Sequence, residues 1–387
     1  MTVVASPTPS TLPSATPRPP QWVLLGAGQA HVQVLLELAK QPLPGTQVIL
    51  VTPHPRQLVA AMVPGFVAGH YALEDCSIPL EPLVQRSGIR WMERSAVAVN
   101  AQQQTLQLDD GSTLHYDWLS INTGPVQDRE KIEQTLPGAR EHGLFVRPID
   151  AFAALWPRVA SMGDERALRV AVIGAGATGC ELALAVRRRL PTAAVTLVCG
   201  LEPPGAAYPA KVQQRLHAVL KQRKVTVLQD IAVSLKADAV QLGCGADLAC
   251  DVPLVATGTQ AAPWLAGSGL ALDAEGFVAV DMYQRSTSHS RVFAAGDVST
   301  RMDRPLARNG VYAQHAGAAL AHNLAAAMAG TALKPHQPPA NSLNLLACGD
   351  RYAVGAWGNF SAQGRWVWWL KHWMDRRLVA RYTGPVA

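Results

Sequence analysis

The segment RVAVIGAGATGCELALAVRRRL, residues 169–190, constrains the fold more than any other part of the chain. An apolar strand runs into Gly174, Gly176 and Gly179, and an apolar helix follows. In such a unit the first glycine makes the tight turn, the second lets the backbone approach a pyrophosphate, and the third lets the helix pack closely on the strand. Free N–H groups and the helix dipole favour an anion at the helix start. The segment therefore predicts a dinucleotide-binding unit of an α/β fold.

A second, incomplete copy of this turn lies at residues 21–40, QWVLLGAGQAHVQVLLELAK. Gly26 and Gly28 follow an apolar strand, but His31 occupies the position of the third glycine. The first two glycines make the turn and the pyrophosphate approach, and a small outward shift of the helix accommodates a larger third residue. We therefore expect this turn to bind a dinucleotide as well. Two interpretations of His31 stay open, a residue of the binding site or a packing and hydrogen-bonding residue.

Three further apolar strands end in short motifs that follow the glycine turns in a fixed order. Each glycine turn is followed, at a comparable distance, by a strand that ends in Thr-Gly, and a last strand closes on Gly-Asp. The whole order is far more specific than any single member. The motifs are Thr123-Gly124, Thr257-Gly258 and Gly296-Asp297.

This order resembles the pyridine nucleotide-disulfide oxidoreductase superfamily, the flavoproteins with two dinucleotide-binding domains. The segments GAGQAHVQVL, AMVPGFVAGHY, RPIDAF and RSTSHSRVFAAGDV resemble its type II NADH dehydrogenase-like branch, especially the subgroup associated with selenophosphate synthetase. The resemblance implies FAD at the first turn, NADH or NADPH at the second, and Asp297 on the FAD ribityl chain. It also implies a functional link to selenophosphate synthetase.

The same resemblance implies an α/β fold with two Rossmann-like domains, in which an inserted NAD(P)H domain splits the FAD domain. The first residues are rich in Pro, Ser and Thr and cannot bury enough apolar surface to offset their ordering entropy. We expect a disordered tail over 1–20, FAD-binding segments over 21–150 and 276–330, an NAD(P)H-binding domain over 151–275, and a C-terminal region over 331–387.

Two strands that follow the glycine turns lack the acidic residue that usually meets the adenosine ribose. The first ends in Thr52-Pro53, so a hydroxyl replaces the carboxylate, and two outcomes stay open: a lowered FAD affinity, or compensation by Arg56 at the phosphates. The second ends in Cys199-Gly200, and no arginine follows that could meet a 2′-phosphate. The preference between NADH and NADPH therefore stays open, as does a vestigial nicotinamide site.

Glu181 resembles the glutamate that type II dehydrogenases place near the nicotinamide and quinone sites, and we predict it as the catalytic residue. The alternative is a polar residue in the first turns of a helix. The quinone-lining segment of those enzymes is altered here, with Val311 and His315-Ala316 at the matching positions. The predicted cofactor-binding residues are Gly26, Gly28, Gln29, Ala30, His31, Thr52, Arg56, Val97, Thr123, Gly124, Gly174, Gly176, Thr178, Gly179, Thr257, Gly258, Gly296 and Asp297.

The C-terminal segment GRWVWWLKHWMDRRLVARY predicts an amphipathic helix. At helical spacing Trp366, Trp369 and Trp373 share a face, while Lys371 and Asp375 lie opposite. Tryptophan and basic residues together suit a bilayer interface, so residues 364–381 predict peripheral membrane contact. The competing interpretation is a helix that packs its tryptophans on the FAD domain or on the partner of a homodimer.

Composition excludes several classes of protein. No apolar run reaches the length needed to cross a bilayer, and no aromatic-basic motif of an RNA-binding sheet occurs, so we expect no nucleic acid partner. The 6 cysteines form no C-x-x-C pair, which argues against a zinc knuckle or any metal site and suits a reducing cytoplasm. A net charge of +6 suits acidic cofactors or the inner face of a membrane.

Three functional hypotheses follow. The leading one is a flavoenzyme that passes electrons from NAD(P)H through FAD to a small acceptor such as a quinone. The rival is a flavin-bearing accessory or sensor protein with a vestigial nicotinamide site. A sulfide:quinone reductase is disfavoured, because no cysteine lies between Cys76 and Cys180 to flank the flavin.

Overall fold

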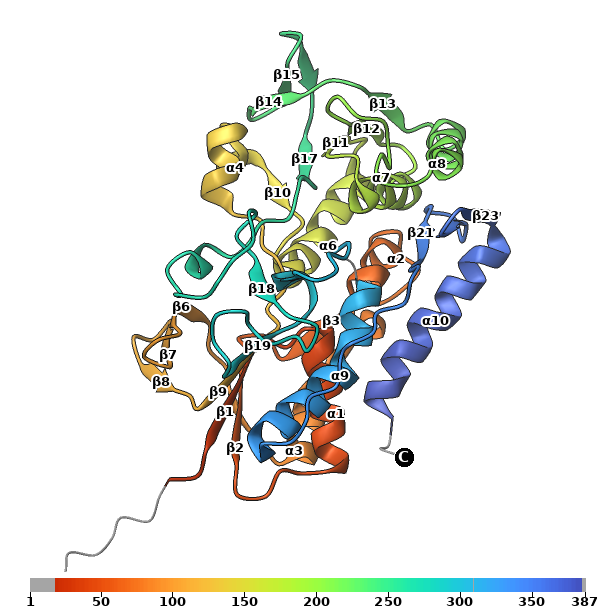
Figure 1. The fold of residues 1–387 in the computed structure, drawn as a ribbon. Helices are drawn as coiled ribbons and strands as arrows, with labels where there is room; N and C mark the ends of the chain where they lie inside the picture. Colours follow the sequence, from red (N-terminus) through yellow and green to blue (C-terminus); the bar gives the residue numbers. More distant parts are fainter. Residues whose placement is uncertain (1–17, 309, 385–387) are drawn as a thin grey trace, which may run out of the picture.

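The computed structural model describes residues 18–308 and 310–384. Two parallel sheets form the frame of this part of the chain, and a small antiparallel sheet with a long helix completes it (Figure 1). The predicted α/β class with two Rossmann-like sheets is confirmed. The tail predicted over residues 1–20 lies outside the described residues, apart from its last positions.

The first sheet contains five parallel strands in the order β19-β9-β1-β2-β5. Its strands are short apolar runs, as expected for a parallel sheet buried on both faces. β1 and β2 pair in register from Gln21↔Gln47 to Leu25↔Val51, so both strands end at the level of the first glycine turn. The bounds are β1 Gln21–Leu25, β2 Gln47–Val51, β5 Arg90–Met92, β9 Trp118–Ile121 and β19 Val292–Ala294.

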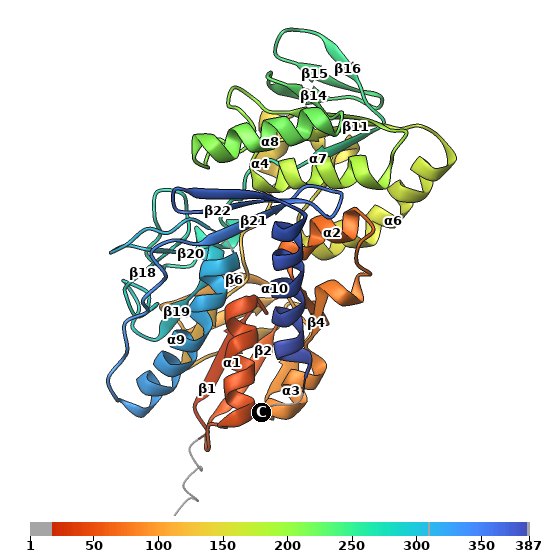
Figure 2. The same cartoon turned by 90° about the vertical axis from the view of Figure 1, so that its right-hand side faces the viewer.

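Alternate residues of β1 enter two different cores. Trp22 and Leu24 pack against helices, and α1 and α9 lie side by side on this face (Figure 2). Val23 and Leu25 pack on the opposite face against a three-stranded antiparallel sheet. The covering elements are α1 Gln29–Lys40, α3 Glu81–Ser87 and α9 Gly310–Ala329 on the helical face, and β6 Ala96–Asn100, β7 Thr105–Leu108 and β8 Thr113–His115 on the other.

The second sheet has the order β10-β17-β11-β12-β13 and the same two-sided burial. Its strands are β10 Leu144–Phe145, β11 Arg169–Ile173, β12 Ala194–Val198, β13 Thr226–Leu228 and β17 Val252–Val255. One face is covered by α6 Ile149–Glu165, α7 Ala177–Arg189 and α8 Ala210–Gln222. The other is covered by α4 Arg129–Thr135, α5 Ala139–His142, β14 Ala232–Leu235, β15 Ala239–Leu242 and β16 Asp247–Ala249.

The crossover between the two units differs from the expected boundary at residue 150. β10 pairs with β17, and α4 and α5 pack on the second sheet, so residues 129–145 belong structurally to the second unit. The chain crosses where Val126 and Gln260 form an isolated bridge. Connecting elements are β3 Arg56–Leu58, η1 Ala60–Met62, α2 Val63–Val67, η2 Glu74–Cys76, β4 Ser77–Pro79, η3 Pro263–Leu265, β18 Val278–Val280, η4 Gly296–Val298 and β20 Ser299–Arg301.

The C-terminal region touches both units. Its antiparallel sheet, β21 Leu343–Ala347, β22 Ala353–Trp357 and β23 Phe360–Gly364, contacts α7 and α8 of the second unit. The helix α10 Arg365–Thr383 then runs along the first unit and contacts β4 and η2 (Figure 2). Asp350 of the β21–β22 turn pairs with Arg188 at 2.6 Å and with Arg223 at 2.5 Å. Arg188 near the end of α7 and Arg223 at the end of α8 therefore tie the C-terminal region to the second unit.

The inward face of α10 buries Val367, Trp368 and Tyr382 together with a Lys371–Asp375 ion pair, while three other tryptophans point outward. Trp366, Trp369 and Trp373 are 61%, 51% and 56% exposed, which contradicts the interpretation that they pack on the FAD domain. Lys371 and Asp375 are buried on the other face. The reason is the surface beneath the helix, where the carbonyl of Ala61 accepts a hydrogen bond from the Lys371 ammonium at 2.7 Å. No helix in the described part of the chain is long and apolar enough to span a membrane.

Candidate functional site

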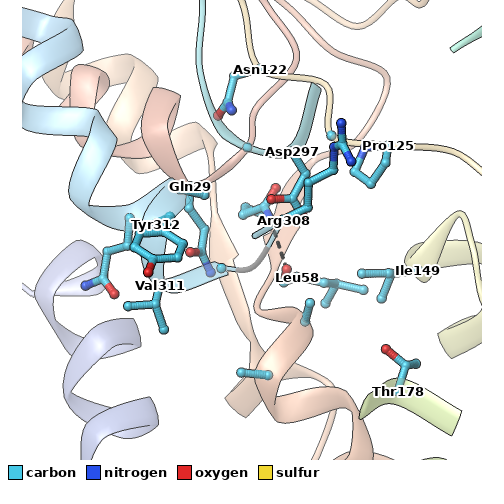
Figure 3. Close-up of a pocket in the computed structure, with 18 of the residues that line it drawn as sticks. Gln29, Leu58, Asn122, Pro125, Ile149, Thr178, Asp297, Arg308, Val311 and Tyr312 are labelled. Atoms are coloured by element: carbon cyan, nitrogen blue, oxygen red, sulfur yellow. Dashed lines mark hydrogen bonds between the residues drawn. The ribbon is translucent and has the colours of Figure 1, made fainter. Parts of the chain in front are cut away.

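A cavity of about 1930 Å³ lies where the two units and the C-terminal region meet. The first glycine turn, the start of α7, the strand β21 and the inner side of α10 all contribute to its wall. Figure 3 shows Gln29, Asp297, Ile149 and Thr178 around the same space, although they come from both units. The fold therefore brings the first glycine turn and, through Thr178, the start of α7 to one chamber, whereas Gly174, Gly176 and Gly179 do not line its wall.

Asn122, which directly precedes the first Thr-Gly motif, holds the first glycine turn in place. Its backbone carbonyl accepts from the Gly28 N–H at 3.0 Å, and its side-chain oxygen accepts from the His31 N–H at 3.1 Å. Its amide nitrogen donates to the Ala295 carbonyl at 2.5 Å, which ties the turn to the end of β19. A Cβ on Gly28 would lie 2.3 Å from the Asn122 side-chain oxygen, so only glycine fits there. The sequence analysis missed this residue.

His31 belongs to the core rather than to the cavity. Its side chain is fully buried, with Nδ1 2.6 Å from the Gly26 carbonyl and Nε2 2.8 Å from the Ser120 hydroxyl. Because a carbonyl only accepts, Nδ1 carries the proton and Nε2 accepts from Ser120. Burial lowers the pKa of His31 to about 4, so the ring is neutral near pH 7. The assignment of His31 and its buried neighbour Ala30 to direct cofactor contact is corrected, since neither lines the cavity.

The second glycine turn shows why its third glycine is required. A Cβ on Gly179 would lie 1.7 Å from the Gly174 carbonyl oxygen, a distance that no packed pair tolerates. A Cβ on Gly176 would meet nothing within 4 Å, so the space before the helix is open. Gly176 is the N-cap of α7 and provides no side-chain cap. Thr178 lines the cavity next to this open helix start, whereas Thr257 and Gly258 stay outside its wall.

Asp297 lies in η4, directly after the first sheet's edge strand β19, and lines the cavity. Burial raises the pKa of its carboxyl group, while the positive charges of Arg147 and Arg308 oppose that rise. Arg147 also lines the cavity, and burial lowers the pKa of its guanidinium. Arg147 belongs to the RPIDAF segment, and the sequence alone does not indicate that its charge lies at the site.

Most of the remaining residues predicted for FAD line the cavity. Gly26, Gln29, Thr123 and Gly124 line the cavity, as do Thr52 and Arg56. The Arg56 Nε is buried and has no hydrogen-bond partner among the described residues, and its nearest carboxylate oxygen, on Asp150, is 3.7 Å away. Val97 is 50% exposed and lies outside the cavity wall, so its predicted cofactor contact is corrected.

Glu181 lines the cavity from α7, and the charges of a buried ion pair on α10 act on it. Its Oε1 accepts from the Ala347 N–H at 2.7 Å. Burial raises the pKa of Glu181 to about 7, and the opposite charges of Lys371 and Asp375 act on it in opposite directions. Lys371 and Asp375 are 2.7 Å apart and line the same cavity. The arrangement therefore places a carboxyl group able to hold or release a proton near neutral pH beside the chamber.

Part of the segment that follows Gly296-Asp297 also reaches the cavity. Val311 and Gln314 of α9 line its wall, while His315 and Ala316 do not. No cysteine lines the cavity in the described part of the chain, and all six cysteines are free thiols. The described residues also hold no cluster of His, Cys, Asp or Glu suited to a metal ion.

Comparison with known proteins connects this site to a family. The family model of Pyridine nucleotide-disulphide oxidoreductase matches residues 20–325. The chain is 26% identical over 246 residues to an NADH dehydrogenase-like protein of Mycobacterium tuberculosis, and the match spans 60% of each chain. It is 25% identical over 284 residues to ferroptosis suppressor protein 1 of Xenopus tropicalis, 68% of this chain and 71% of that protein.

Two solved structures share the fold. The sulfide:quinone oxidoreductase of Aquifex aeolicus superposes with a TM-score of 0.76 at 16% identity, over 94% of this chain and 91% of that one. NDH2 from Plasmodium falciparum, solved in complex with NADH, superposes with a TM-score of 0.75 at 12% identity, over 96% of this chain and 100% of that one.

Proposed function

Because the chain belongs to the pyridine nucleotide-disulphide oxidoreductase family, we propose that it is an FAD-dependent oxidoreductase. It takes reducing equivalents from NADH or NADPH and passes them to a quinone or a similar small acceptor. The observation that carries the proposal is the single cavity that receives the first glycine turn, Asp297, the start of α7 and Glu181. The names of the relatives and solved structures, which include an NADH dehydrogenase-like protein and a sulfide:quinone oxidoreductase, support the same chemistry.

The residues present fit FAD at the first turn. Gly28 has no side chain to cap the start of α1, and although Asn122 accepts from the His31 N–H, the helix dipole favours a pyrophosphate in front of this turn. The unpartnered Arg56 Nε beside the cavity suits an anionic oxygen. Asp297 provides a buried carboxylate acceptor for a hydroxyl group. We assign these residues, with Gly26, Thr123 and Gly124, to the FAD site.

NADH or NADPH is assigned to the second turn, where Gly176 leaves open space and Thr178 lines the cavity. We divide the chain accordingly into a split FAD domain and an inserted NAD(P)H domain, with the crossover near Val126 and Gln260. Bound FAD supplies the two-electron chemistry. The protein's own contribution is to orient the two ligands in one chamber and to exclude water from it.

We assign proton delivery to Glu181. Reduction of a quinone consumes protons, and Glu181 is a cavity-lining carboxyl group whose pKa, raised to about 7 by burial, matches that task. The Ala347 N–H fixes one carboxyl oxygen, and the Lys371 ammonium compensates the charge when the proton leaves. Sulfide oxidation is disfavoured, because no described cysteine lines the cavity.

The rival proposal is a flavin-bearing accessory or sensor protein, linked to selenophosphate synthetase, with a vestigial nicotinamide site. The absence of an acidic residue at Cys199-Gly200 favours it. Stopped-flow absorbance of the purified flavoprotein distinguishes the two. Rapid bleaching of the flavin by NADH or NADPH supports the oxidoreductase, and a flavin that stays oxidised with both supports the rival.

We further propose a peripheral position on the inner face of a membrane, with the exposed tryptophan face of α10 at the lipid. Trp366, Trp369 and Trp373 are more than half exposed, and Arg377 and Arg381 on the same helix line the cavity near Trp373. Indole rings and arginines together favour an anionic lipid interface. A lipid-soluble acceptor would then reach the cavity beside the helix. A homodimer that covers the same face is the competing arrangement.

A further inference from the structure

A second, much smaller chamber adjoins the large cavity at Asp297. Its volume is about 50 Å³. Asp297, Arg308 and Tyr312 line both spaces, so the small chamber is separated from the large cavity only by these residues and their neighbours. Gln284, Arg301 and His336 close its far side.

Three buried polar atoms of the chamber wall have no hydrogen-bond partner among the described residues. They are the Oε1 of Gln284, the Nε2 of His336 and the Nε of Arg308. Gln284 is 2% exposed and His336 6% exposed, so bulk water does not satisfy them. Leaving such a group unpaired costs about 1 to 3 kcal/mol. Three such atoms around one space indicate a bound polar group.

Two of the three side chains that carry these atoms are held by their other atoms. Gln284 donates from Nε2 to the Ala316 carbonyl at 3.1 Å. Arg308 donates to Glu275 at 2.7 Å and stacks on the Phe277 ring at 3.6 Å. The unpartnered atoms of Gln284 and Arg308 therefore cannot turn away to find other partners without breaking these contacts.

The chemistry of the wall selects water over an anion. The Arg301 and Arg308 guanidinium groups are already neutralised by Asp303 and by Asp273 with Glu275. The Asp297 carboxyl group lies in the wall and would repel an anion. Water both donates and accepts, which matches an amide oxygen, a guanidinium N–H and an imidazole nitrogen. A volume of about 50 Å³ is well above the roughly 10 to 15 Å³ that a single water needs, so the chamber has room for two water molecules.

We propose that this chamber is an internal water-binding site whose two waters join the Asp297 carboxyl group to Gln284 and His336. The waters fix the Asp297 carboxylate from the small chamber. Gln284 and His336, which do not line the large cavity, thereby act as positioning residues for Asp297. The expected effect on FAD affinity rests on the proposed function, whereas the presence of the two waters does not.

The first experiment is a crystal structure of the full chain at a resolution that shows ordered water. We expect two density peaks within about 3.2 Å of the Gln284 Oε1, the His336 Nε2 and the Arg308 Nε. His336→Phe keeps a ring of similar size and removes Nε2, so it should lose one peak. His217→Phe, at an exposed position of α8, should keep both. A chamber without density in the wild-type protein would overturn the proposal.

The second experiment measures the FAD dissociation constant of the same proteins by titration of the apoprotein. We expect His336→Phe and Gln284→Leu to weaken FAD by about tenfold each, the equivalent of about 1.4 kcal/mol, and His217→Phe to match the wild type. Gln284→Glu restores an acceptor oxygen and should recover part of the affinity. Unchanged affinity in both variants would overturn the positioning role. If the wild-type chain binds no FAD while the two waters are present, the proposed function fails and the water site stands.

Discussion

His31 and Gly26 are joined through the hydrogen bond from the His31 Nδ1 to the Gly26 carbonyl, 2.6 Å long. In the second unit the same spacing places Gly179 beside Gly174, where even a Cβ would lie 1.7 Å from the carbonyl oxygen. The two units therefore pack the helix against the glycine turn in different ways. The second unit has a glycine at this position, and the first has a histidine ring that donates a hydrogen bond to the turn.

Burial of the His31 ring, which the hydrogen bond to Gly26 only partly offsets, makes the stability of the fold sensitive to acid. The unfolded chain protonates His31 near its ordinary pKa of 6.5, whereas the folded chain resists protonation until about pH 4. Stability from this residue is thus complete above pH 6.5 and falls as the pH drops towards 4, by about 3 kcal/mol in total. His31→Gln should flatten this dependence when urea midpoints are compared between pH 4.5 and 7.5. His217→Gln, at an exposed position, should leave it intact. An equal slope in wild type and His31→Gln would contradict the assignment.

Asp297→Ala should lower the FAD content of the purified protein. Loss of a hydrogen bond to a charged acceptor costs about 1.5 to 3 kcal/mol, or roughly 10- to 100-fold in affinity. The ratio of flavin to protein absorbance provides the measurement. Asp164→Ala removes an exposed carboxylate that pairs with Arg189 and serves as the control. Full flavin occupancy in Asp297→Ala would remove this residue from the FAD site.

Gly179→Ala and Gly176→Ala form a matched pair that separates folding from ligand approach. The first places a Cβ 1.7 Å from the Gly174 carbonyl and should lower the free energy of unfolding and slow flavin reduction by NAD(P)H. The second meets no protein atom within 4 Å, so it should keep the stability and weaken only the nucleotide. Both should retain FAD. If flavin reduction is unchanged in both, the vestigial-site proposal gains support.

Glu181→Gln tests the proton-delivery assignment. In the wild type Glu181 is protonated below about pH 7 and ionised above it, so acceptor reduction should slow as the pH rises through 7. The variant should lose this step and react about 100-fold more slowly at pH 6, with flavin reduction by NAD(P)H unchanged. Glu202→Gln, at an exposed site, is the control. If the rate of acceptor reduction in Glu181→Gln still falls as the pH rises through 7, another group is responsible for this pH dependence.

The tryptophan face of α10 gives a prediction about membranes. Replacing Trp366, Trp369 and Trp373 with serine should leave the melting temperature within a few degrees, because these side chains are more than half exposed. The triple variant should lose co-sedimentation with anionic vesicles, and binding by the wild type should weaken with salt and with neutral lipid. A wild type that does not bind vesicles but elutes as a dimer would support the competing arrangement.

The sequence predicted the parts of the fold that depend on local spacing. The glycine turns fix short, close approaches along the chain, so Gly26, Gly174 and Gly179 could be interpreted without a structure. Val97 could not, because no local pattern tells whether a strand residue beside a sheet edge faces a cavity or solvent.

Long-range features escaped the sequence analysis for a physical reason. Helical periodicity separates Trp369 from Lys371 but does not tell which face lies inward, since that depends on the polarity of the partner surface around Ala61. The meeting of Glu181 with Lys371 likewise joins α7 to α10 across the molecule. Asn122 had a local signal, its position directly before Thr123-Gly124, which could have been used.

The C-terminal region has a mechanical consequence. Its sheet is pinned to the second unit by Asp350, and α10 is pinned to the first by Lys371 and by the Arg376–Asp75 pair at 2.5 Å. Residues 343–383 therefore hold the two units at a fixed distance from each other. The spacing of the two glycine turns can change only if the backbone bends at Gly364, between β23 and α10. Electron transfer in this chain should then proceed without a movement of one unit relative to the other. The ligands should enter and leave a cavity whose walls keep their positions.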